Sequence, residues 1–384
     1  MKFRLLLVLL VLVLIHSACQ EKETTQEVVI APEALETDLP LEKVNLPEGF
    51  KISLFAQDVE NARSMAFSPN GTLFVGTRGK GDIYALVDKN GDYYAETKYT
   101  LDTALNMPNG VAFKDGDLYV AEVNRILKYE NIEANLENPP KPVVIYDQYP
   151  TERHHGWKYI AFGPDDKLYV PVGAPCNICE SEDEVFNTIT RINPDGSNME
   201  IVQRGVRNTV GFTWHPETKE LWFTDNGRDH LGDEIPACEL NHAPKDDMHF
   251  GYPYCHQGDI VDEDIEHDRD CSEFTAPAQN LGPHVAPLGI EFVNQKQFPN
   301  QFGDYALIAE HGSWNRTEKI GYRISMVKLN GNQAERYEVF ADGWLGEDKE
   351  EVWGRPVDLE FLPDGSMLIS DDFADAIYRI TYSD

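Results

Sequence analysis

Two adjacent histidines, His154 and His155, stand with Gly156 and Trp157 directly in front of an ordinary strand–turn–strand pattern, IAFGPDDKLYV. An imidazole titrates near neutral pH, so it can act as a general base. A lone histidine in such a place would more often make a structural hydrogen bond. Its importance therefore depends on which other polar side chains reach the same place.

Polar and cationic residues also precede the other strand–turn–strand patterns of the chain. They are Arg63, Asn109, the pair Arg207 and Asn208, His284 and Arg355. The chain carries 66 Asp and Glu against 33 Lys and Arg, so its composition does not predict a gathering of arginines and histidines. If these segments meet in the fold, they form a positive, imidazole-bearing site suited to a planar or anionic ligand.

The strand–turn–strand pattern itself repeats along the chain. Each copy has an apolar residue and an aromatic one, a turn of Pro, Asn, Asp or Gly, and a second apolar run, which predicts a β-hairpin. The aromatic residue recurs at Phe67, Phe113, Phe162, Trp214, Phe292 and Phe361. Intervals of about 45–50 residues, lengthened by insertions in the fourth and fifth copies, are typical of a β-propeller.

We therefore expect an all-β fold, a six-bladed β-propeller over residues 43–384. The early strand at Phe50, FKISLFAQ, would complete the last blade and close the ring. The first strand of each hairpin would be innermost, and the loops leading into it would open onto one mouth of the central channel. The alternative is a β-sandwich in which the similarity of the copies is accidental.

The bulk composition is that of a globular protein with a large core. The chain has 384 residues, of which 41% are hydrophobic and 26% charged, and its formal net charge is −33. Because phosphate binding needs clustered lysines and arginines, this acidic balance argues against a nucleic-acid partner. It also argues against direct attraction to an anionic membrane.

Residues 1–18 have the features of a signal peptide: two basic residues, a short apolar run and two small residues before Cys19. The apolar run is too short to span a bilayer. The segment resembles a bacterial lipobox, in which Cys19 is lipidated and becomes the new N-terminus, although His16 stands where the pattern prefers Leu. Plain secretion with cleavage near Ala18 is the alternative.

Residues 19–42 are acidic, rich in threonine and without an apolar period. This composition predicts a flexible tether behind the lipidated N-terminus. We therefore expect an exported protein that is lipid-anchored to the cell envelope through Cys19, facing the periplasm or the cell surface, with no other membrane contact.

Five further cysteines follow Cys19. Export favours disulfides, and the CNIC segment is followed by Glu180, so it is not the C-x-x-C-H of a c-type haem site. No second C-x-x-C is present for a zinc site. Five cysteines allow many arrangements; we expect Cys176–Cys179 and Cys255–Cys271, with Cys238 unpaired.

Seven stretches of the chain together resemble the soluble quinoprotein sugar dehydrogenases that use pyrroloquinoline quinone (PQQ), particularly the sorbosone/glucose dehydrogenase-like proteins. They are HHGWKYIAFGPDDKLYVPVGAPCNIC, RGVRNTVGFTWHP, TDNGRDHLGDEI, HFGYPYC, HVAPLGIEF, EHGSWNRTEKIGYRISMV and GRPVDLEFLPDG. The resemblance covers most of residues 45–384. It implies an oxidoreductase that transfers a hydride from C1 of an aldose or sorbosone-like sugar to PQQ.

The resemblance also implies roles for individual residues. The family's catalytic histidine stands eight residues before the Gly of GPD, which makes His155 the general base and His154 the fallback. The implied PQQ-binding residues are Arg207, Asn208, Lys319 and Arg355. Val357 stands where the family has a second arginine, and the family's early glutamine has no clear match, with Asn106 and Asn109 lying nearby.

Calcium is the metal that the resemblance implies. Two consecutive backbone carbonyls hold it on PQQ, here those of Gly227 and Arg228, where Arg228 replaces a proline and brings a cation beside the ion. A second, structural Ca²⁺ would use Glu234, since hard oxygen ligands suit this ion. The alternative for Asp233 and Glu234 is a solvated acidic turn.

The implied partners are a small-molecule sugar and a separate electron acceptor, a cytochrome or a quinone. Two other function classes stay open. A metal-dependent lactonase-type hydrolase would ring one ion with carboxylates and asparagines, whereas the segments singled out here carry arginine and histidine. A non-catalytic, cell-surface carbohydrate-binding propeller would be consistent with the loss of two cofactor contacts.

Overall fold

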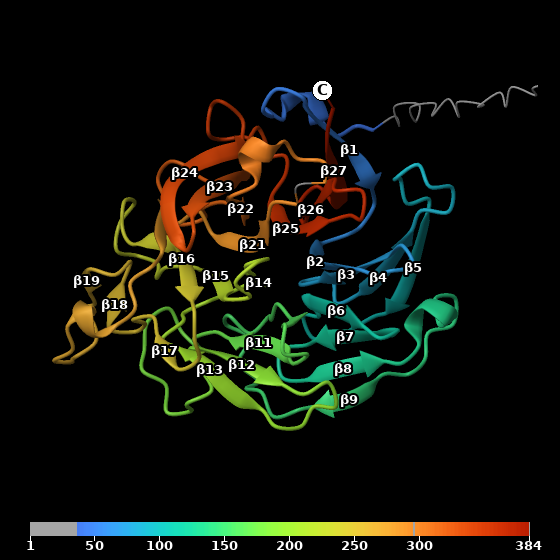
Figure 1. Cartoon of the computed structure of the whole chain (residues 1–384). Helices are drawn as coiled ribbons and strands as arrows, with labels where there is room; N and C mark the ends of the chain where they lie inside the picture. The colour runs from blue at the N-terminus through green and yellow to red at the C-terminus, as the bar shows by residue number, and fades with distance from the viewer. Residues whose placement is uncertain (1–36, 295, 384) are drawn as a thin grey trace, which may run out of the picture. The chain divides into compact units, whose positions relative to one another are not determined.

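The computed structural model describes residues 37–294 and 296–383, and this part of the chain forms a ring of six sheets around a common axis (Figure 1). Each sheet has four strands, and one of them gains a short fifth strand. The prediction of an all-β, six-bladed β-propeller is confirmed. The predicted signal peptide, Cys19 and most of the predicted tether lie outside the described residues.

The first three blades run along the chain from the innermost strand outward. Blade 1 consists of β2 (Ala62–Phe67), β3 (Thr72–Thr77), β4 (Ile83–Val87) and β5 (Thr97–Asp102). Blade 2 consists of β6 (Gly110–Lys114), β7 (Asp117–Ala121), β8 (Ile126–Tyr129) and β9 (Val143–Tyr146), with the short 3₁₀ helix η2 (Ile132–Asn135) after β8. Blade 3 consists of β10 (Ala161–Phe162), β11 (Leu168–Val172), β12 (Thr188–Ile192) and β13 (Glu200–Arg204).

The remaining blades carry the insertions and the ring closure. Blade 4 consists of β14 (Phe212–Trp214), β15 (Leu221–Asp225), β16 (Ala237–Ala243) and β20 (Gln279–Pro283). Blade 5 consists of β21 (Pro287–Phe292), β22 (Tyr305–Glu310), β23 (Arg323–Asn330) and β24 (Gln333–Ala341), with η4 (Asn300–Phe302) between β21 and β22. Blade 6 consists of β25 (Pro356–Phe361), β26 (Met367–Asp371), β27 (Ala376–Tyr382) and the early strand β1 (Phe50–Ala56).

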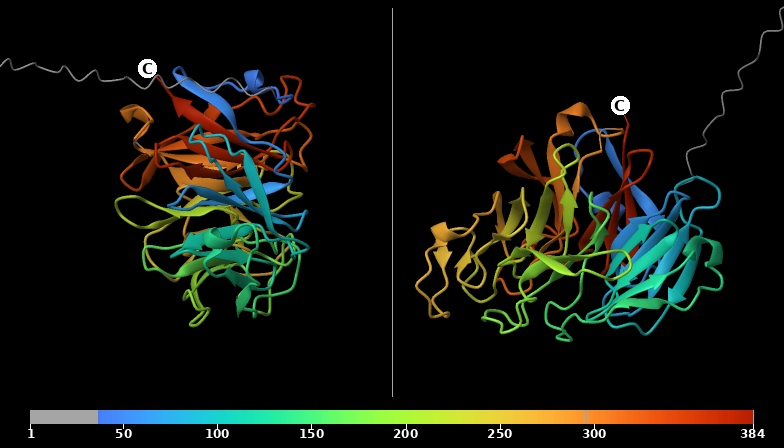
Figure 2. Two further views of the ribbon diagram at one scale, coloured as in Figure 1. Left: turned by 90° about the vertical axis from the view of Figure 1, so that its right-hand side faces the viewer. Right: turned by 60° about the horizontal axis from the view of Figure 1, so that its bottom comes forward.

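The ring closes where β1 pairs antiparallel with β27, from Phe50 opposite Tyr382 to Ala56 opposite Ile377. Both views of Figure 2 show this N-terminal strand beside the C-terminal strands. The prediction that the strand at Phe50 completes the last blade is confirmed. Both ends of the domain therefore belong to one sheet, which holds the ring together without a covalent bond.

The inner strands come so close to the next blade that only glycine fits at some positions. A Cβ added at Gly211 would lie 2.0 Å from the carbonyl oxygen of Leu288, and one at Gly110 would lie 2.5 Å from the carbonyl oxygen of Lys158. Both obstacles are backbone atoms of the neighbouring inner strand or of the loop that leads into it. This close approach brings the loops leading into the inner strands together at one mouth of the axis.

Hydrophobic side chains fill the wedges between neighbouring blades. Phe74 of β3 stacks on Phe113 of β6 with 5.4 Å between ring centroids. Tyr119 of β7 meets Phe162 of β10 edge to face at 4.9 Å. Each such aromatic pair adds about 0.5–1.5 kcal/mol beyond the area it buries. The aromatic positions of the sequence repeat are therefore the contacts that join one blade to the next.

A small extension follows β16 in blade 4 and contains β17 (Met248–His249), β18 (Cys255–His256), β19 (Ile260–Val261) and η3 (Cys271–Glu273). It is tied by the disulfide Cys255–Cys271, and β17 pairs parallel with β13 of blade 3. The other disulfide is Cys176–Cys179, and Cys238 is free and buried. The predicted cysteine pairing is confirmed.

The last residues of the segment predicted as a tether pack against the folded domain. Leu39 and Leu41 already pack against the core between blades 5 and 6, and η1 spans Leu41–Lys43. The backbone of Asn45 exchanges hydrogen bonds of 2.9 and 3.2 Å with that of Asp342. The compact unit therefore begins at Thr37 rather than at residue 43, because the leucines of this acidic segment have apolar surface to cover.

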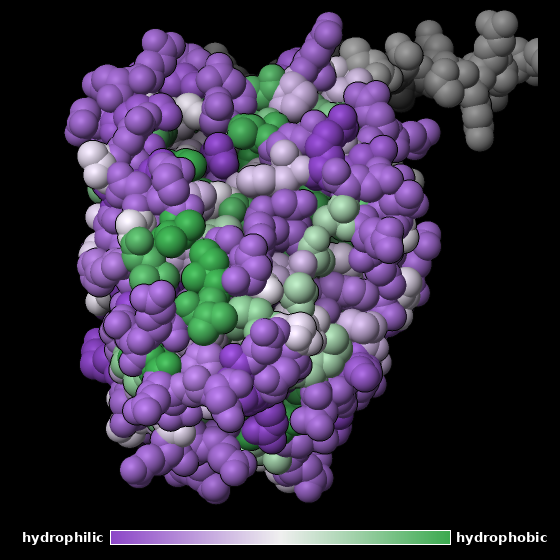
Figure 3. Space-filling model, turned by 90° about the vertical axis from the view of Figure 1, so that its left-hand side faces the viewer, coloured by the Kyte–Doolittle hydropathy of each residue, from purple (hydrophilic) through white to green (hydrophobic). Residues whose placement is uncertain are grey.

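Among the described residues, no helix has the length and apolar character needed to cross a membrane. Figure 3 shows one side of the ring in space-filling form, covered mostly by hydrophilic residues, with its largest hydrophobic area near the middle and smaller ones elsewhere. This surface agrees with the strongly acidic composition of the chain.

The close packing of the inner strands makes a prediction for Gly211→Ala. The added methyl group would meet the backbone of Leu288, so we expect a loss of unfolding free energy of about 1–3 kcal/mol, the usual cost of overpacking a rigid core. Urea denaturation would measure it. The control is Gly79→Ala, whose Cβ would lie 3.6 Å from its nearest neighbour, the side-chain oxygen of Asn61. Equal stability of the two variants would contradict the proposed close approach.

Candidate functional site

A cavity of about 480 Å³ lies at the mouth where the loops leading into the inner strands converge. Its cationic lining consists of the five arginines Arg63, Arg78, Arg153, Arg207 and Arg355. Four histidines also line it: His154, His155, His284 and His311. Asp229 is the one carboxylate among the described lining residues. A protein with a formal net charge of −33 thus has a strongly basic cavity.

His155 occupies the loop between β9 and β10, in a left-handed backbone conformation with φ of 49°. Its Nδ1 atom lies 3.0 Å from the carbonyl oxygen of Ala174. Because a carbonyl only accepts hydrogen bonds, Nδ1 carries the proton and donates it, which leaves a free lone pair on Nε2. Gly173 makes room for this arrangement, since a Cβ there would lie 2.7 Å from the Cβ of His155.

The surroundings of His155 keep its imidazole neutral. Burial lowers the pKa of His155 well below its usual value, and the charges of Arg207 and His154 lower it further. The exposed His154 has its ring centroid 4.0 Å from that of His155, and burial and Arg207 lower its pKa as well. The structure thus brings both predicted histidines to the cavity, with His155 as the more buried one.

A third imidazole, that of His311, forms part of a buried ion-pair network. Its Nε2 donates to Asp372 at 2.7 Å, and the other carboxylate oxygen of Asp372 accepts from Arg63 at 2.9 Å. Arg63 in turn donates to the side-chain oxygen of Asn109 at 2.8 Å. Burial lowers the pKa of His311 to about 4 in spite of Asp372, so its Nδ1 presents a second lone pair.

Arg78 follows β3 and stacks on an aromatic ring at the edge of the cavity. Its guanidinium carbon lies 3.7 Å from the centroid of the Trp157 indole, close enough for a cation–π contact. Among the described residues, no hydrogen-bond partner is found for the guanidinium of Arg78. Burial, with the nearby charge of Arg63, lowers the pKa of Arg78 to about 10. Its N–H donors are therefore free for an anion.

Arg355 and Asn208, both predicted from the sequence, also line the cavity. The Nε of Arg355 donates to the carbonyl oxygen of His311 at 3.1 Å, and its Nη2 donates to that of Gly312 at 3.2 Å. Within the described part of the chain, neither Nη1 of Arg355 nor the side-chain amide of Asn208 has a partner. Both groups can still bind a ligand.

Arg207 differs from the other arginines because all of its donors are used. Its Nε and Nη2 donate to the backbone and side-chain oxygens of Asn177 at 3.0 and 2.8 Å, and Nη2 also donates to Asp229 at 3.1 Å. Nη1 donates to the carbonyl oxygens of Asn226 at 3.0 Å and Gly227 at 2.8 Å. A guanidinium has five N–H groups, so none is left for a ligand.

The residues predicted to hold Ca²⁺ on the cofactor do not fit that ion. The carbonyl oxygen of Gly227 already accepts from Arg207. At about 4 Å in a medium of effective dielectric about 20, a divalent ion and a guanidinium repel each other by about 8 kcal/mol. The side chain of Arg228, which was expected to bring a cation beside the ion, is instead buried and paired with Asp262 and Asp264 at 2.5 and 2.9 Å, outside the cavity lining.

Glu234 and Lys319, also predicted from the sequence, lie outside the cavity lining. Glu234 is exposed and accepts from Arg316 at 2.7 Å, so its carboxylate is not arranged around a structural metal. Lys319 is not among the cavity-lining residues and lies 3.5 Å from the carboxylate of Glu350. Its loop folds over Ser313, whose backbone N donates to Ile320 at 2.9 Å, and this directs the lysine away from the cavity.

An apolar cluster with members from four blades lies next to the cavity, and two of its residues, Trp157 and Leu288, line it. Val210, Leu288 and Val357 are buried together, and Trp157 packs against them. Val357 is the position where the resemblance implied a second arginine. A charged side chain there would lie inside this apolar cluster, which explains why the valine fits the fold.

Sequence reasoning missed several lining residues because it considered only the loops before the inner strands. Each hairpin returns to the same mouth, so the residue after its second strand also reaches the cavity. Arg78 follows β3, Asn226 follows β15 and His311 follows β22. This position after the second strand is the sequence signal that would have found them.

Asn315 and Trp314 complete the wall. Both atoms of the Asn315 side-chain amide are buried without a hydrogen-bond partner. Trp314 is 69% exposed and meets His230 edge to face at 5.7 Å. An unpaired amide beside an exposed indole is suited to a polar ligand with one flat face.

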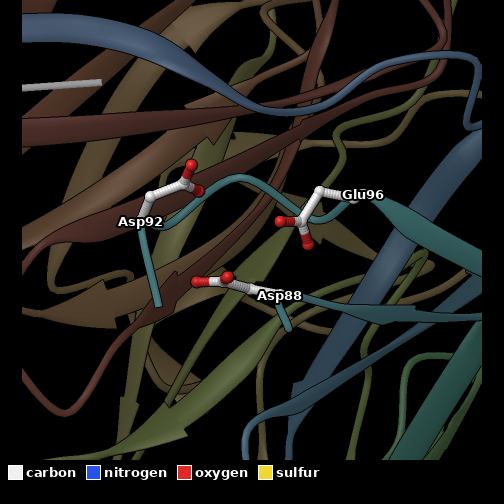
Figure 4. A group of neighbouring side chains, drawn as sticks. All are labelled: Asp88, Asp92 and Glu96. Carbon is white, nitrogen blue, oxygen red and sulfur yellow. The ribbon is translucent and has the colours of Figure 1, made fainter. Parts of the chain in front are cut away.

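A cluster of carboxylates lies elsewhere, on the loop between β4 and β5. Asp88, Asp92 and Glu96 point toward one another there (Figure 4), with oxygen atoms within 4.8 Å of each other. None of the three lines the cavity. This cluster is thus separate from the basic cavity.

Known proteins resemble this chain in sequence or in structure. A protein of Borreliella burgdorferi strain B31, described as uncharacterized, is 33% identical over 354 residues, which cover 88% of this chain and 91% of that protein. The calcium structure of Trichoderma reesei carbohydrate-active enzymes family AA12 has a TM-score of 0.78 at 21% identity, covering 92% of this chain and all of that one. The holo form of the pyranose dehydrogenase PQQ domain from Coprinopsis cinerea has a TM-score of 0.74 at 16% identity, covering 91% of this chain and 99% of that one.

These structures share the fold of this chain. The sequence model of one family, described as TrAA12-like, matches residues 44–383, nearly the whole propeller. The chain belongs to the TrAA12-like family.

Proposed function

We propose that this protein is a quinoprotein dehydrogenase that oxidises a sugar at C1, with PQQ as its cofactor and His155 as the general base. The observation that carries the proposal is the cavity, where five arginines and four histidines face one carboxylate. PQQ is a planar molecule with three carboxylates, and guanidinium groups are the preferred partners of carboxylates. The names of the similar structures, a PQQ domain among them, support the same cofactor.

The donors left free in the cavity fit such a cofactor. The guanidinium of Arg78, Nη1 of Arg355 and the amide of Asn208 line the cavity without hydrogen-bond partners among the described residues. The indole of Trp157 and the side chain of Leu288 supply apolar surface for a flat ring system. A cavity of about 480 Å³ lies within the range of small-molecule sites.

In this proposal each ring nitrogen of His155 has its own role. The carbonyl of Ala174 holds the Nδ1–H, and the free lone pair of Nε2 serves as the base that accepts the proton of the sugar's C1 hydroxyl. When bound, PQQ accepts the hydride that leaves C1. The product is the lactone, and two electrons remain on the cofactor for a separate acceptor, such as a cytochrome or a quinone.

The other function classes fit this cavity less well. A metal-dependent hydrolase would need several carboxylates at the channel, and Asp229, the carboxylate in the described lining, is engaged by Arg207. A carbohydrate-binding propeller without catalysis would have no use for two neutral imidazoles with free lone pairs. The dehydrogenase therefore explains more of the site.

Export and lipid anchoring through Cys19 are a second part of the proposal. The basic, apolar and small residues before Cys19 support it. The two disulfides support it as well, because disulfides persist in oxidising compartments.

The role of His155 can be tested by His155→Gln. Without the base, we expect kcat to fall by about 10²–10⁴-fold while PQQ still binds, because general-base catalysis contributes that much. Dye reduction with a panel of aldoses measures turnover, and quenching of tryptophan fluorescence measures cofactor binding. In the wild-type protein, kcat/KM should stay constant as the pH falls to 6.5, since the lowered pKa of His155 keeps it unprotonated there.

His311→Gln is the matched comparison, because His311 is another buried histidine of the same cavity. A larger loss of kcat in this variant than in His155→Gln would move the general base to His311. An acid limb with a midpoint above pH 6.5 would also contradict the assignment to His155.

The free guanidinium of Arg78 makes a prediction for cofactor binding. Arg78→Gln removes a charge-assisted hydrogen bond worth about 1.5–3 kcal/mol, so the Kd for PQQ should rise by about 10–100-fold. Isothermal titration calorimetry measures this change. Arg204→Gln, outside the cavity lining, is the control and should leave the Kd unchanged; equal effects of both variants would show that net charge rather than the Arg78 contact matters.

The anchoring proposal predicts that Cys19→Ala releases the protein from the membrane. In a bacterial host, the wild-type chain should incorporate radiolabelled palmitate and sediment with membranes, whereas the variant should do neither. Cys238→Ala, which alters a buried cysteine of the folded domain, is the control. An unlabelled wild-type protein recovered free in the medium or periplasm would favour plain secretion.

A further inference from the structure

We propose that the guanidinium of Arg207 takes the place of a divalent cation beside the cofactor, so that this chain binds PQQ without Ca²⁺. The inference rests on the proposed function and concerns the same cavity. It starts from the disagreement between the metal ligands expected from the sequence and the contacts that these groups make.

The oxygens around Arg207 are of the kind that hard cations prefer. They comprise three backbone carbonyls, of Asn177, Asn226 and Gly227, together with the side-chain oxygen of Asn177 and a carboxylate oxygen of Asp229. Ca²⁺ is typically bound by six to eight such oxygens. Here five of them converge on the guanidinium at 2.8–3.1 Å.

The charge of this group of oxygens is already balanced. Asp229 supplies the one negative charge and Arg207, with its side chain 3% exposed, supplies the one positive charge. A Ca²⁺ ion at the carbonyl of Gly227 would need this guanidinium to leave, and its departure would break five hydrogen bonds. No other carboxylate lines the described cavity to compensate two further positive charges.

The position of Arg207 is fixed by its partners. The amide of Asn177 donates to the carbonyl of Asp229 at 3.0 Å, and its oxygen accepts from the backbone N of Asp229 at 2.8 Å. Asn177 lies within the Cys176–Cys179 disulfide loop, whose Cys179 N donates to the hydroxyl of Tyr252 at 3.2 Å. The disulfide loop thus holds Asn177 in place, and Asn177 holds the guanidinium against the carbonyls of Asn226 and Gly227.

The charge of Arg207 acts on His155, the proposed general base. Among the charged neighbours of His155, Arg207 lowers the pKa of its imidazole the most. With every N–H committed, the guanidinium provides a positive potential near the ligand without donating a hydrogen bond to it. A metal ion bound at these carbonyls would provide the same potential, which makes the ion dispensable.

The first experiment measures PQQ binding to the full-length apo-protein by quenching of tryptophan fluorescence, in excess EGTA and in excess Ca²⁺. We expect the two Kd values to agree within about twofold, because the guanidinium already neutralises the site. Arg207→Ala should weaken binding in EGTA by about tenfold or more and recover with Ca²⁺, since the freed oxygens can then accept the ion. Arg204→Ala is the matched control and should behave as the wild type.

The second experiment titrates Ca²⁺ alone into the apo-protein by calorimetry. It uses an Asp88→Asn, Asp92→Asn background, so that the carboxylate cluster of that loop contributes no binding. The chain with Arg207 should take up no Ca²⁺, and the chain with Arg207→Ala should take up one equivalent. Should Arg207→Ala fail to fold, Arg207→Met removes the charge, keeps a side chain of similar length and replaces it in both experiments.

The outcomes separate the two proposals. If the wild type binds PQQ only with Ca²⁺, or takes up Ca²⁺ in the loop-variant background, the inference is overturned while the proposed function stands. If PQQ binds under neither condition, the proposed function is overturned, and the calorimetry still decides whether Arg207 excludes the metal. Ca²⁺-independent binding of PQQ with no uptake of Ca²⁺ supports both.

Discussion

The close contact between the inner strands of neighbouring blades is the constraint on which the site depends. Glycines such as Gly110 and Gly211 allow the backbones to meet at distances that no side chain would permit. Because the strands cannot separate, the loops that precede and follow them are held around a narrow axis. Residues more than two hundred positions apart in the sequence, such as Arg63 and Asp372, are thereby brought within 2.9 Å.

Two arginines of this crowded mouth are paired with a carboxylate. Asp372 pairs with Arg63 and also accepts a hydrogen bond from the neutral His311, and Asp229 pairs with Arg207; Arg78 and Arg355 have no carboxylate partner among the described residues. A buried ion pair costs desolvation, so its value here is positional rather than stabilising. Arg63 and Arg207, which are paired with carboxylates, have a structural role, whereas Arg78 and Arg355 keep donors that are available to a ligand.

The sequence was sufficient for the fold and for part of the site. The repeat of aromatic positions predicted six blades, and the order of the hairpins predicted that His155, Arg207, Asn208 and Arg355 would converge. It was insufficient wherever a role depends on which partner a side chain finds in three dimensions. Arg207 reaches the cavity as expected, but the loop around Asn177 supplies acceptors for all its donors, which no local pattern reveals. Lys319 was assigned by motif, yet the path of its loop carries it to Glu350.

The position of the cavity, at the mouth next to the apolar cluster of Val210, Leu288 and Val357, has a consequence for turnover. Any two reactants that use this cavity have to approach it from the same mouth. A molecule that delivers electrons and a molecule that removes them then compete for one doorway and cannot be present together. Turnover in such a pocket follows a ping-pong order, in which the first product vacates the site before the second reactant approaches.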